Sequence, residues 1–495
     1  MKSRMFLSVV VAAFAAWSIV VSLEPSPRAA LLAAQKVNTA ERIQRVENGL
    51  LPAVVIKGQA APMKLAERMA HYKTPGVSVA VINNGAVEWA KAYGVVEAGG
   101  ARAVTTETMF QAASISKPVA AMGALRLVEQ GKLSLDEDVN LKLKSWKTPE
   151  NEFTKDQRVT LRRLVSHSAG LTVHGFRGYA AGEPVPTLTQ ALDGQKPANS
   201  APIRVDTPPG GKWRYSGGGY NVMQQLVIDV SGKPFPDFMR EVVLKRIGMA
   251  HSTYEQPLPP SLADKVAVGH RMDGTPVPGK WHAHPEMAAA GLWTTPTDLA
   301  RFAIGVINAK TGKTNKLISR ELATQMLTKQ TGDWGLGVSL AGEGKAFNFG
   351  HGGSNVGFKC QLVAFPETGQ GVAVMTNGDQ GSRLAAEIIR AVAKEYGWGD
   401  WLPVERALAT VNPEIFKAYV GEYEIDGKAT ISTENGKLFV QPPGRSRIEL
   451  YPSSETEFFT LTDNIRIVFI KDAQGAVSGL TAHLGGRSLN GKRVK

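Results

Sequence analysis

Apolar and polar residues begin to alternate near residue 77 of this chain. Val77, Val79 and Val81 fall on one side of an extended segment, Asn84-Gly85 interrupts it, and a second alternating run follows over 87–93. Asn-Gly between two alternating runs is typical of a tight hairpin turn. The pattern therefore predicts an antiparallel strand pair as the first folded element.

The spacing of apolar residues then becomes helical. A broad apolar face over 118–131 predicts a helix, which Gly131 would end. Helical patterns and Gly/Pro-rich loops fill 135–330, strand-like runs return over 335–376, and a closing helix is expected at 383–396. This order predicts an α/β fold in which a helical insertion domain separates the strands of one antiparallel sheet flanked by helices.

The pattern changes once more near the C-terminus. Residues 412–495 form short alternating segments separated by Gly, Pro, Asn and Asp. Such spacing favours a small β-barrel or sandwich. We therefore expect a main domain over 35–400 and a β-rich domain over 405–495.

The first residues have the features of an export signal. Lys2 and Arg4 precede the uncharged apolar stretch 5–21, which gives a charged region followed by a hydrophobic one. The small-residue cleavage pattern over 22–34 is indistinct, and the apolar stretch is almost long enough to cross a bilayer. Residues 1–34 are thus expected to be a signal peptide or a membrane anchor. Either reading places the working domain outside the cytoplasm, in the periplasm or the extracellular space.

Composition narrows the classes of function. The net charge is +13 over 495 residues, but Lys and Arg are scattered among acidic residues, which argues against a nucleic-acid site. Cys360 is the one cysteine, so internal disulfides and multi-cysteine metal sites are excluded. It lies in an apolar alternating stretch and is expected to be a buried structural thiol. His282 and His284 have metal-like spacing but no evident partner cluster, so we interpret them as loop histidines.

A candidate nucleophile precedes the helix at 118–131. Ser114 and Lys117 stand three residues apart, which puts hydroxyl and amine on one helical face within reach of each other. A lysine activates a serine if burial or a neighbouring cation lowers its pKa. Free N–H groups at the helix start would also suit an oxyanion. The spacing alone is common by chance and indicates little without other evidence.

Two later segments add candidate chemistry. Tyr215 lies in a Gly-rich loop, and beside a lysine ammonium its phenolate would become accessible for moving a proton. His351-Gly-Gly-Ser354 lies on an alternating strand, where glycines allow a substrate or a backbone to approach closely. Each segment alone is more often structural than catalytic.

The ordered set of three segments resembles a known family. Ser114-x-x-Lys117, Tyr215-Ser-Gly217 and His351-Gly-Gly353 are similar to the three signature boxes of serine β-lactamases and penicillin-binding proteins, including class C β-lactamases, D-Ala-D-Ala peptidases and related esterases. Three further segments also resemble the family, at 164–171, 288–299 and 334–337.

The resemblance implies roles for individual residues. Ser114 would form an acyl-enzyme, with Lys117 and Tyr215 acting as general base and then acid. The N–H groups of Ser114 and Ser354 would hold the oxyanion, and His351 and Gly353 would line the substrate. The resemblance implies no metal and no organic cofactor.

Two positions depart from the family pattern. The middle box usually ends in asparagine, which contacts the substrate amide, and here it ends in Gly217. The third box often begins with lysine, which attracts a substrate carboxylate, and here it begins with His351, mostly neutral at pH 7. Both changes favour an esterase or peptidase over an efficient β-lactamase.

We therefore expect an exported serine hydrolase acting through an acyl-enzyme on a small-molecule or peptide ester or amide, D-amino-acid peptides among them. The alternative is a non-hydrolytic penicillin-binding or sensor protein that keeps the fold. The substrate and the oligomeric state are not determined by the sequence.

Overall fold

The computed structural model describes residues 38–59, 62–314, 316–444, 447–485 and 487–494. The predicted signal or anchor at 1–34 lies outside the described residues. Contacts divide the chain into a unit ending at Ile43, of which residues 38–43 are helical, and a unit from Gln44 onward. Within the described ranges, every helix is too short or too polar to cross a bilayer.

A six-stranded antiparallel sheet with the order β3-β2-β9-β8-β7-β6 lies at the centre of the main domain. Strands from the two ends of this domain meet where β2 pairs with β9, with Ala80 opposite Ala373. The predicted sheet interrupted by a helical insertion is therefore confirmed. Its strands are β2 (Gly76–Asn83), β3 (Ala86–Gly94), β6 (Ser339–Ala341), β7 (Asn348–Asn355), β8 (Phe358–Phe365) and β9 (Gln370–Thr376).

The predicted hairpin forms β2 and β3, with Asn84 and Gly85 both at positive φ in the turn. Its first strand differs from the expected one-sided pattern, because β2 is buried on both faces and only Asn83 is partly exposed. Its neighbours β3 and β9 cover its edges, and helices cover the faces of the sheet. Small or apolar residues at every position of β2 before Asn83 match this burial.

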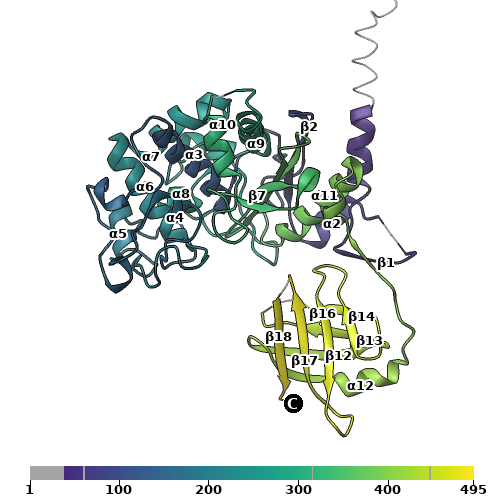
Figure 1. The fold of residues 1–495 in the computed structure, drawn as a ribbon. Helices are drawn as coiled ribbons and strands as arrows, with labels where there is room; N and C mark the ends of the chain where they lie inside the picture. Colours follow the sequence, from purple (N-terminus) through teal and green to yellow (C-terminus); the bar gives the residue numbers. More distant parts are fainter. Residues whose placement is uncertain (1–37, 60–61, 315, 445–446, 486, 495) are drawn as a thin grey trace, which may run out of the picture. The chain divides into compact units, whose positions relative to one another are not determined.

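Helices enclose the sheet and form the insertion (Figure 1). Helix α9 packs against β2, β3, β8 and β9, and α11 packs against β8 and β9. Ala80 and Met375 share a core with α9, whereas buried Val79 and Val374 point to the other face. The helices are α2 (Leu65–His71), α3 (Ser116–Glu129), α4 (Leu161–Val165), α5 (Leu188–Asp193), α6 (Gly217–Ser231), α7 (Phe235–Met239), α8 (Met287–Ala290), α9 (Pro296–Lys310), α10 (Arg320–Met326) and α11 (Gly381–Tyr396).

Two short strand pairs complete the main part of the chain. They are the parallel pair of β1 (Val54–Ile56) with β10 (Val404–Arg406), and the antiparallel pair of β4 (Phe110–Gln111) with β5 (Trp293–Thr294).

The C-terminal segment is a closed antiparallel barrel, which decides between the two predicted β architectures. Its core is separate from that of the main domain and contains stacked Tyr419 and Phe469 rings with centroids 4.1 Å apart. Helix α12 (Phe416–Tyr419) precedes it. The strands are β11 (Gly421–Glu424), β12 (Lys428–Glu434), β13 (Lys437–Gln441), β14 (Ile448–Pro452), β15 (Glu457–Phe459), β16 (Arg466–Lys471), β17 (Val477–Leu484) and β18 (Arg487–Arg493).

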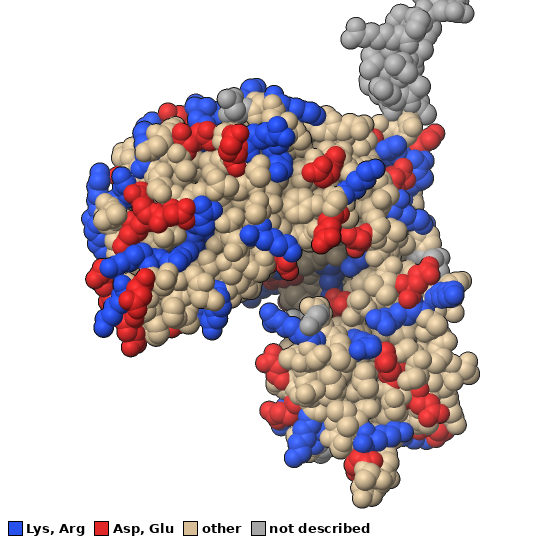
Figure 2. All heavy atoms as spheres, viewed as in Figure 1, with Lys and Arg blue, Asp and Glu red and all other residues tan. Residues whose placement is uncertain are grey.

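Charged side chains of both signs are interleaved on the face shown in Figure 2. Blue Lys and Arg side chains stand next to red Asp and Glu side chains over most of that face. On this face the basic side chains are thus distributed among acidic neighbours, as the scatter of Lys and Arg along the sequence indicated.

Candidate active site

The candidate nucleophile lies in a tight turn at the start of a buried helix. Ser114 is the middle residue of the 3₁₀ turn Ala113–Ile115, and α3 begins directly after it at Ser116. Ala113 has φ of 48°, a left-handed conformation that is uncommon for a residue with a side chain. Such local strain is concentrated at functional sites. The turn places Ser114 at the amino end of α3, as predicted.

Lys117 approaches Ser114 from the first turn of α3. Its Nζ donates to Ser114 Oγ at 3.0 Å and to the Ala289 carbonyl at 2.8 Å. The side chain is 2% exposed, and this burial lowers the pKa of Lys117 to about 7. A neutral amine can therefore form near pH 7 and accept the proton of Ser114.

Tyr215 lies beside Ser114 and Lys117, on the loop that leads into α6. Ser216 begins that helix by accepting a hydrogen bond from the Gly219 N–H, which holds Tyr215 in place. The Lys117 ammonium lies 4.9 Å from the centre of the Tyr215 ring, over its face. Burial raises the pKa of Tyr215, and a hydrogen bond with Ser114 opposes this only in part. The expected accessible phenolate is therefore wrong: Tyr215 is a neutral phenol, suited to donating a proton.

The His167 ring packs against the Tyr215 ring. Its ring centre lies 4.2 Å from that of Tyr215, and its Nδ1 accepts the backbone N–H of Ser216 at 3.1 Å. Burial and the nearby Lys117 lower the pKa of His167, so the ring is uncharged. His167 has φ of 59°, so it forms a turn. It is a positioning residue for the phenol.

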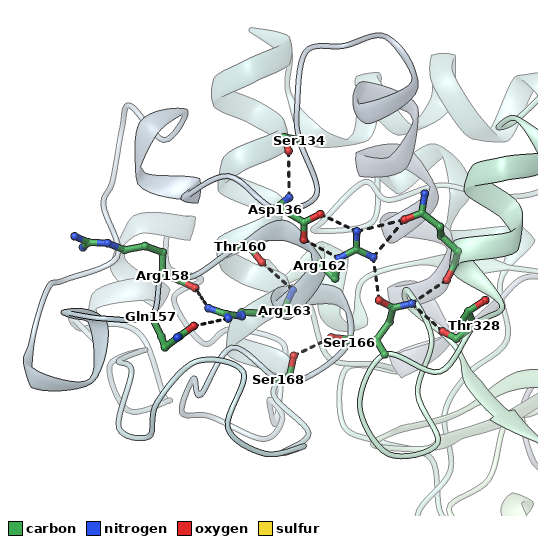
Figure 3. A network of polar contacts seen from close by, with 12 residues as sticks. Ser134, Asp136, Gln157, Arg158, Thr160, Arg162, Arg163, Ser166, Ser168 and Thr328 are labelled. Carbon is green, nitrogen blue, oxygen red and sulfur yellow. Dashed lines mark hydrogen bonds and ion pairs between the residues drawn. The ribbon is translucent and has the colours of Figure 1, made fainter.

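A polar network anchors the segment that leads into this turn (Figure 3). Arg162 on α4 donates to Asp136, Gln325 and Gln330, and so connects three separate segments. Ser166 and Ser168, on either side of His167, are hydrogen-bonded to each other at 3.0 Å. These bonds keep the turn that carries His167 at a defined place relative to α4.

Strand β7 presents an open edge to the site. β6 pairs with β7 only over 348–350, so the later part of that edge has no strand partner among the described residues. Asn355 and Phe358 flank a two-residue hairpin loop, so their pair exchanges hydrogen bonds and the next pair, Ser354 with Lys359, does not. The Ser354 N–H therefore points away from β8, toward the open edge. This is the direction that an oxyanion donor needs.

Gly353 lets β7 lie directly against the nucleophile turn. A Cβ at this position would lie 2.3 Å from the Ala112 carbonyl oxygen and 2.3 Å from Cys360 Sγ. Cys360 is buried, as predicted, and its thiol donates to the same Ala112 carbonyl at 3.0 Å. The absence of a side chain at 353 thus sets the distance between β7 and Ser114.

His351, on β7, lies beside Tyr215 and Lys117. Its Nε2 lies 3.4 Å from the Tyr215 hydroxyl, and its Nδ1 lies 2.5 Å from the Gly352 carbonyl. Burial and Lys117 lower the pKa of His351 to about 3. The ring is neutral at pH 7, as its residue type indicated, and it carries no charge for a substrate carboxylate.

These residues surround one cavity of about 920 Å³. Of the residues predicted from the sequence, Gly217 alone is not part of its wall. Sequence reasoning missed Phe176 and Arg177, which carry no motif, and it did not assign Ala289 or Trp334 a place in the site although their segments resembled the family. The predicted residues in the wall are Ser114, Lys117, Tyr215, His351, Gly353 and Ser354.

No group of His, Cys, Asp and Glu within the described ranges has an arrangement that would hold a metal ion. Of the His-x-His pair, His282 Nδ1 contacts the Arg177 carbonyl at 3.0 Å, and His284 is fully buried with its pKa lowered to about 3. The pair is part of the packing beside the site, as expected for loop histidines.

Comparison with known proteins places this geometry in a family. The family described as Beta-lactamase matches residues 64–396, more than half of the chain. The chain belongs to the β-lactamase family. This match covers the six-stranded sheet, the helical insertion and all three predicted boxes, and it confirms the resemblance.

Individual relatives show how far the likeness extends along the chain. Penicillin-binding protein 4* of Bacillus subtilis is 22% identical over 435 residues, 81% of this chain and 91% of that protein. Penicillin-binding protein 4 of Amycolatopsis lactamdurans is 26% identical over 381 residues, 74% of this chain and 96% of that protein.

The fold is also shared with a solved structure, the octameric penicillin-binding protein homologue from Pyrococcus abyssi. The TM-score is 0.56 at 23% identity, with 86% of this chain and 98% of that chain covered. At this identity the likeness shows a shared fold.

Proposed function

We propose that this chain is an exported serine hydrolase that acts on an ester or amide through an acyl-enzyme formed on Ser114. One observation carries the proposal: the buried Lys117 amine, with a pKa of about 7, is hydrogen-bonded to Ser114 Oγ at 3.0 Å. A deprotonated lysine in that position is a general base for the serine hydroxyl.

The residues divide the reaction between them. Lys117 Nζ takes the Ser114 proton as Oγ attacks the carbonyl carbon, and the N–H groups of Ser114 and Ser354 bind the resulting oxyanion. Tyr215 then donates its hydroxyl proton to the leaving group as the bond to carbon breaks, and it recovers a proton from the Lys117 ammonium. Water attacks the acyl-enzyme with the same groups acting in reverse, which releases the acid and frees Ser114.

Intact mass spectrometry tests the nucleophile. The purified protein and Ser114→Ala are each incubated with benzylpenicillin and with a short nitrophenyl ester. We expect a wild-type adduct equal to the whole penicillin, because an opened β-lactam ring stays attached, together with release of nitrophenol from the ester. Equal adduct or ester turnover in Ser114→Ala would contradict the assignment of Ser114.

A non-hydrolytic penicillin-binding or sensor role is the second candidate. It is favoured by the two departures from the family pattern, Gly217 and the neutral His351. Acylation of Ser114 without measurable release of the acyl group would support this role. Steady multiple turnover of an ester or peptide would remove it.

The location outside the cytoplasm is also a proposal, and it rests on the charged and apolar N-terminal stretch. Fractionation of cells producing the chain with and without residues 1–34 tests it. Retention of both forms in the cytoplasm would contradict export, whereas membrane retention of the full chain alone would identify an anchor.

A further inference from the structure

An aromatic side chain fills the space beside Gly217, which lies two positions after the candidate acid Tyr215. A Cβ on Gly217 would lie 3.0 Å from Phe176 Cε2 and 3.1 Å from the His174 carbonyl oxygen. Phe176 is half-buried against the main core and forms part of the cavity wall that also contains Ser114. The phenyl ring thus occupies the space into which a side chain at 217 would project.

The same cavity has little to attract an anionic substrate. Within the described part of the chain, its Lys and Arg residues are Lys117 and Arg177. Lys117 is buried with a pKa of about 7, and it is engaged by Ser114 and Ala289. Arg177 Nη2 lies 2.9 Å from both carboxylate oxygens of Glu183. A substrate carboxylate near Arg177 would meet the Glu183 carboxylate as well.

We propose that the cavity takes an uncharged ester or amide whose apolar acyl group lies against the ring of Phe176, which makes Phe176 a specificity-determining residue. The inference rests on the proposed hydrolase function and specifies its substrate class. A phenyl ring offers apolar contact and no hydrogen bond, so a polar group placed against it would lose its water without gaining a partner. Each acyl methylene that it covers should raise kcat/KM about fourfold.

Kinetics on the full protein with nitrophenyl esters of acetate, hexanoate and adipate test the proposal. Hexanoate and adipate have the same number of carbons and differ by one terminal carboxylate. We expect kcat/KM to rise from acetate to hexanoate, and hexanoate to exceed adipate by about tenfold or more, because the charged end must leave water without a free cation to meet it.

The Phe176→Ala variant locates the apolar contact. It should lower kcat/KM for hexanoate about tenfold and change that for acetate by less than about threefold, because only the longer chain reaches the ring. Phe153→Ala, another half-buried phenylalanine outside the cavity, is the matched control and should preserve the ratio of the two esters. Circular dichroism and thermal unfolding verify that both variants are folded.

A pair of substitutions tests the geometry independently of any substrate. Gly217→Ala should lower the Tm clearly in the wild-type background and less in the Phe176→Ala background, where the ring no longer occupies the space. Equal losses of Tm in both backgrounds would show that Phe176 does not fill the space beside Gly217.

The kinetic outcomes separate this inference from the function on which it rests. A preference for adipate that Arg177→Gln abolishes, or equal effects of Phe176→Ala on acetate and hexanoate, would overturn the inference and leave the hydrolase intact. Failure of every ester to acylate Ser114 would overturn the proposed function, and the inference with it.

Discussion

Burial shifts the pKa values of single residues in this site more than charge pairs do. Burial lowers the pKa of Lys117 to about 7 and raises that of Tyr215, so the amine loses its proton more readily and the phenol keeps its own. His351 and His167 are held neutral by the same cause together with Lys117. The same burial therefore favours a neutral amine and a neutral phenol side by side, as the proposed base and acid require.

This tuning predicts the pH dependence of acylation. Below about pH 7 the Lys117 amine is protonated and has no lone pair for the Ser114 proton, so kcat/KM should rise with pH through about 7 and level off above it. At pH 5 the value should be about a hundredfold below the plateau. Stopped-flow acylation by a nitrophenyl ester between pH 5 and 9 measures it.

Glu286 provides the control for that assignment. Burial raises the pKa of Glu286 to about 7 as well, and its carbonyl caps the short helix α8 whose Ala289 contacts Lys117. If Lys117 is the titrating base, Glu286→Gln keeps the rising limb at about pH 7. Loss of the limb in this variant would transfer the pH dependence to Glu286.

At the scale of elements, the site depends on how closely β7 meets the turn before α3. Ser114 and the Ser354 N–H belong to segments about 240 residues apart in the chain, and they act together only if the two backbones nearly touch. Gly353, Cys360 and the Ala112 carbonyl form that contact. Gly353 of the third box is therefore needed for packing as much as for access to substrate.

Alanine substitutions at Gly352 and Gly353 separate the need for close packing from the need for access to substrate. Gly353→Ala should destabilise the fold by about 1–3 kcal/mol and impair acylation, since its Cβ would lie 2.3 Å from the Ala112 carbonyl oxygen, a backbone atom. Gly352→Ala meets only the end of the flexible Gln361 side chain, at 3.0 Å, and should cost far less stability. Urea unfolding of both variants measures the difference, and equal losses would refute this explanation.

At the scale of the whole molecule, the main core and the barrel core share no residue within the described part of the chain. The main core joins the sheet to the helical insertion, and the barrel closes around its own aromatic cluster. A closed barrel pairs all of its strands and leaves no edge to be completed by another element. We therefore expect the barrel to unfold as a unit of its own.

A pair of neighbouring substitutions tests this independence. Phe469→Ala removes a ring that contacts Tyr419, Tyr423 and Phe458, and it should destabilise the barrel by about 3–5 kcal/mol. Ile470→Ala, the next residue and 43% exposed, should change stability by less than about 0.5 kcal/mol. Calorimetry should show two transitions, of which Phe469→Ala shifts only one, and acylation of Ser114 should be unchanged. If the protein shows one transition in all, and Phe469→Ala both shifts it and abolishes acylation, the two parts do not unfold independently.

Much of the architecture could be predicted from the sequence because the signals are local. The hairpin at 76–94, helix α3, the closing helix α11 and the β-rich C-terminal segment follow from periodicity and turn residues, which act between near neighbours. Ser114, Lys117, Tyr215 and His351 were found because their short motifs recur in a family.

Tertiary structure alone decided how these residues are tuned and enclosed. The state of Tyr215 was misjudged because its pKa depends on burial by distant segments, which no motif encodes. The wall residues Phe176 and Arg177 carry no local signature, and neither does the closure of the C-terminal strands into a barrel. Local spacing determines which groups can act, whereas long-range packing determines their distances, their surrounding dielectric and hence their chemistry.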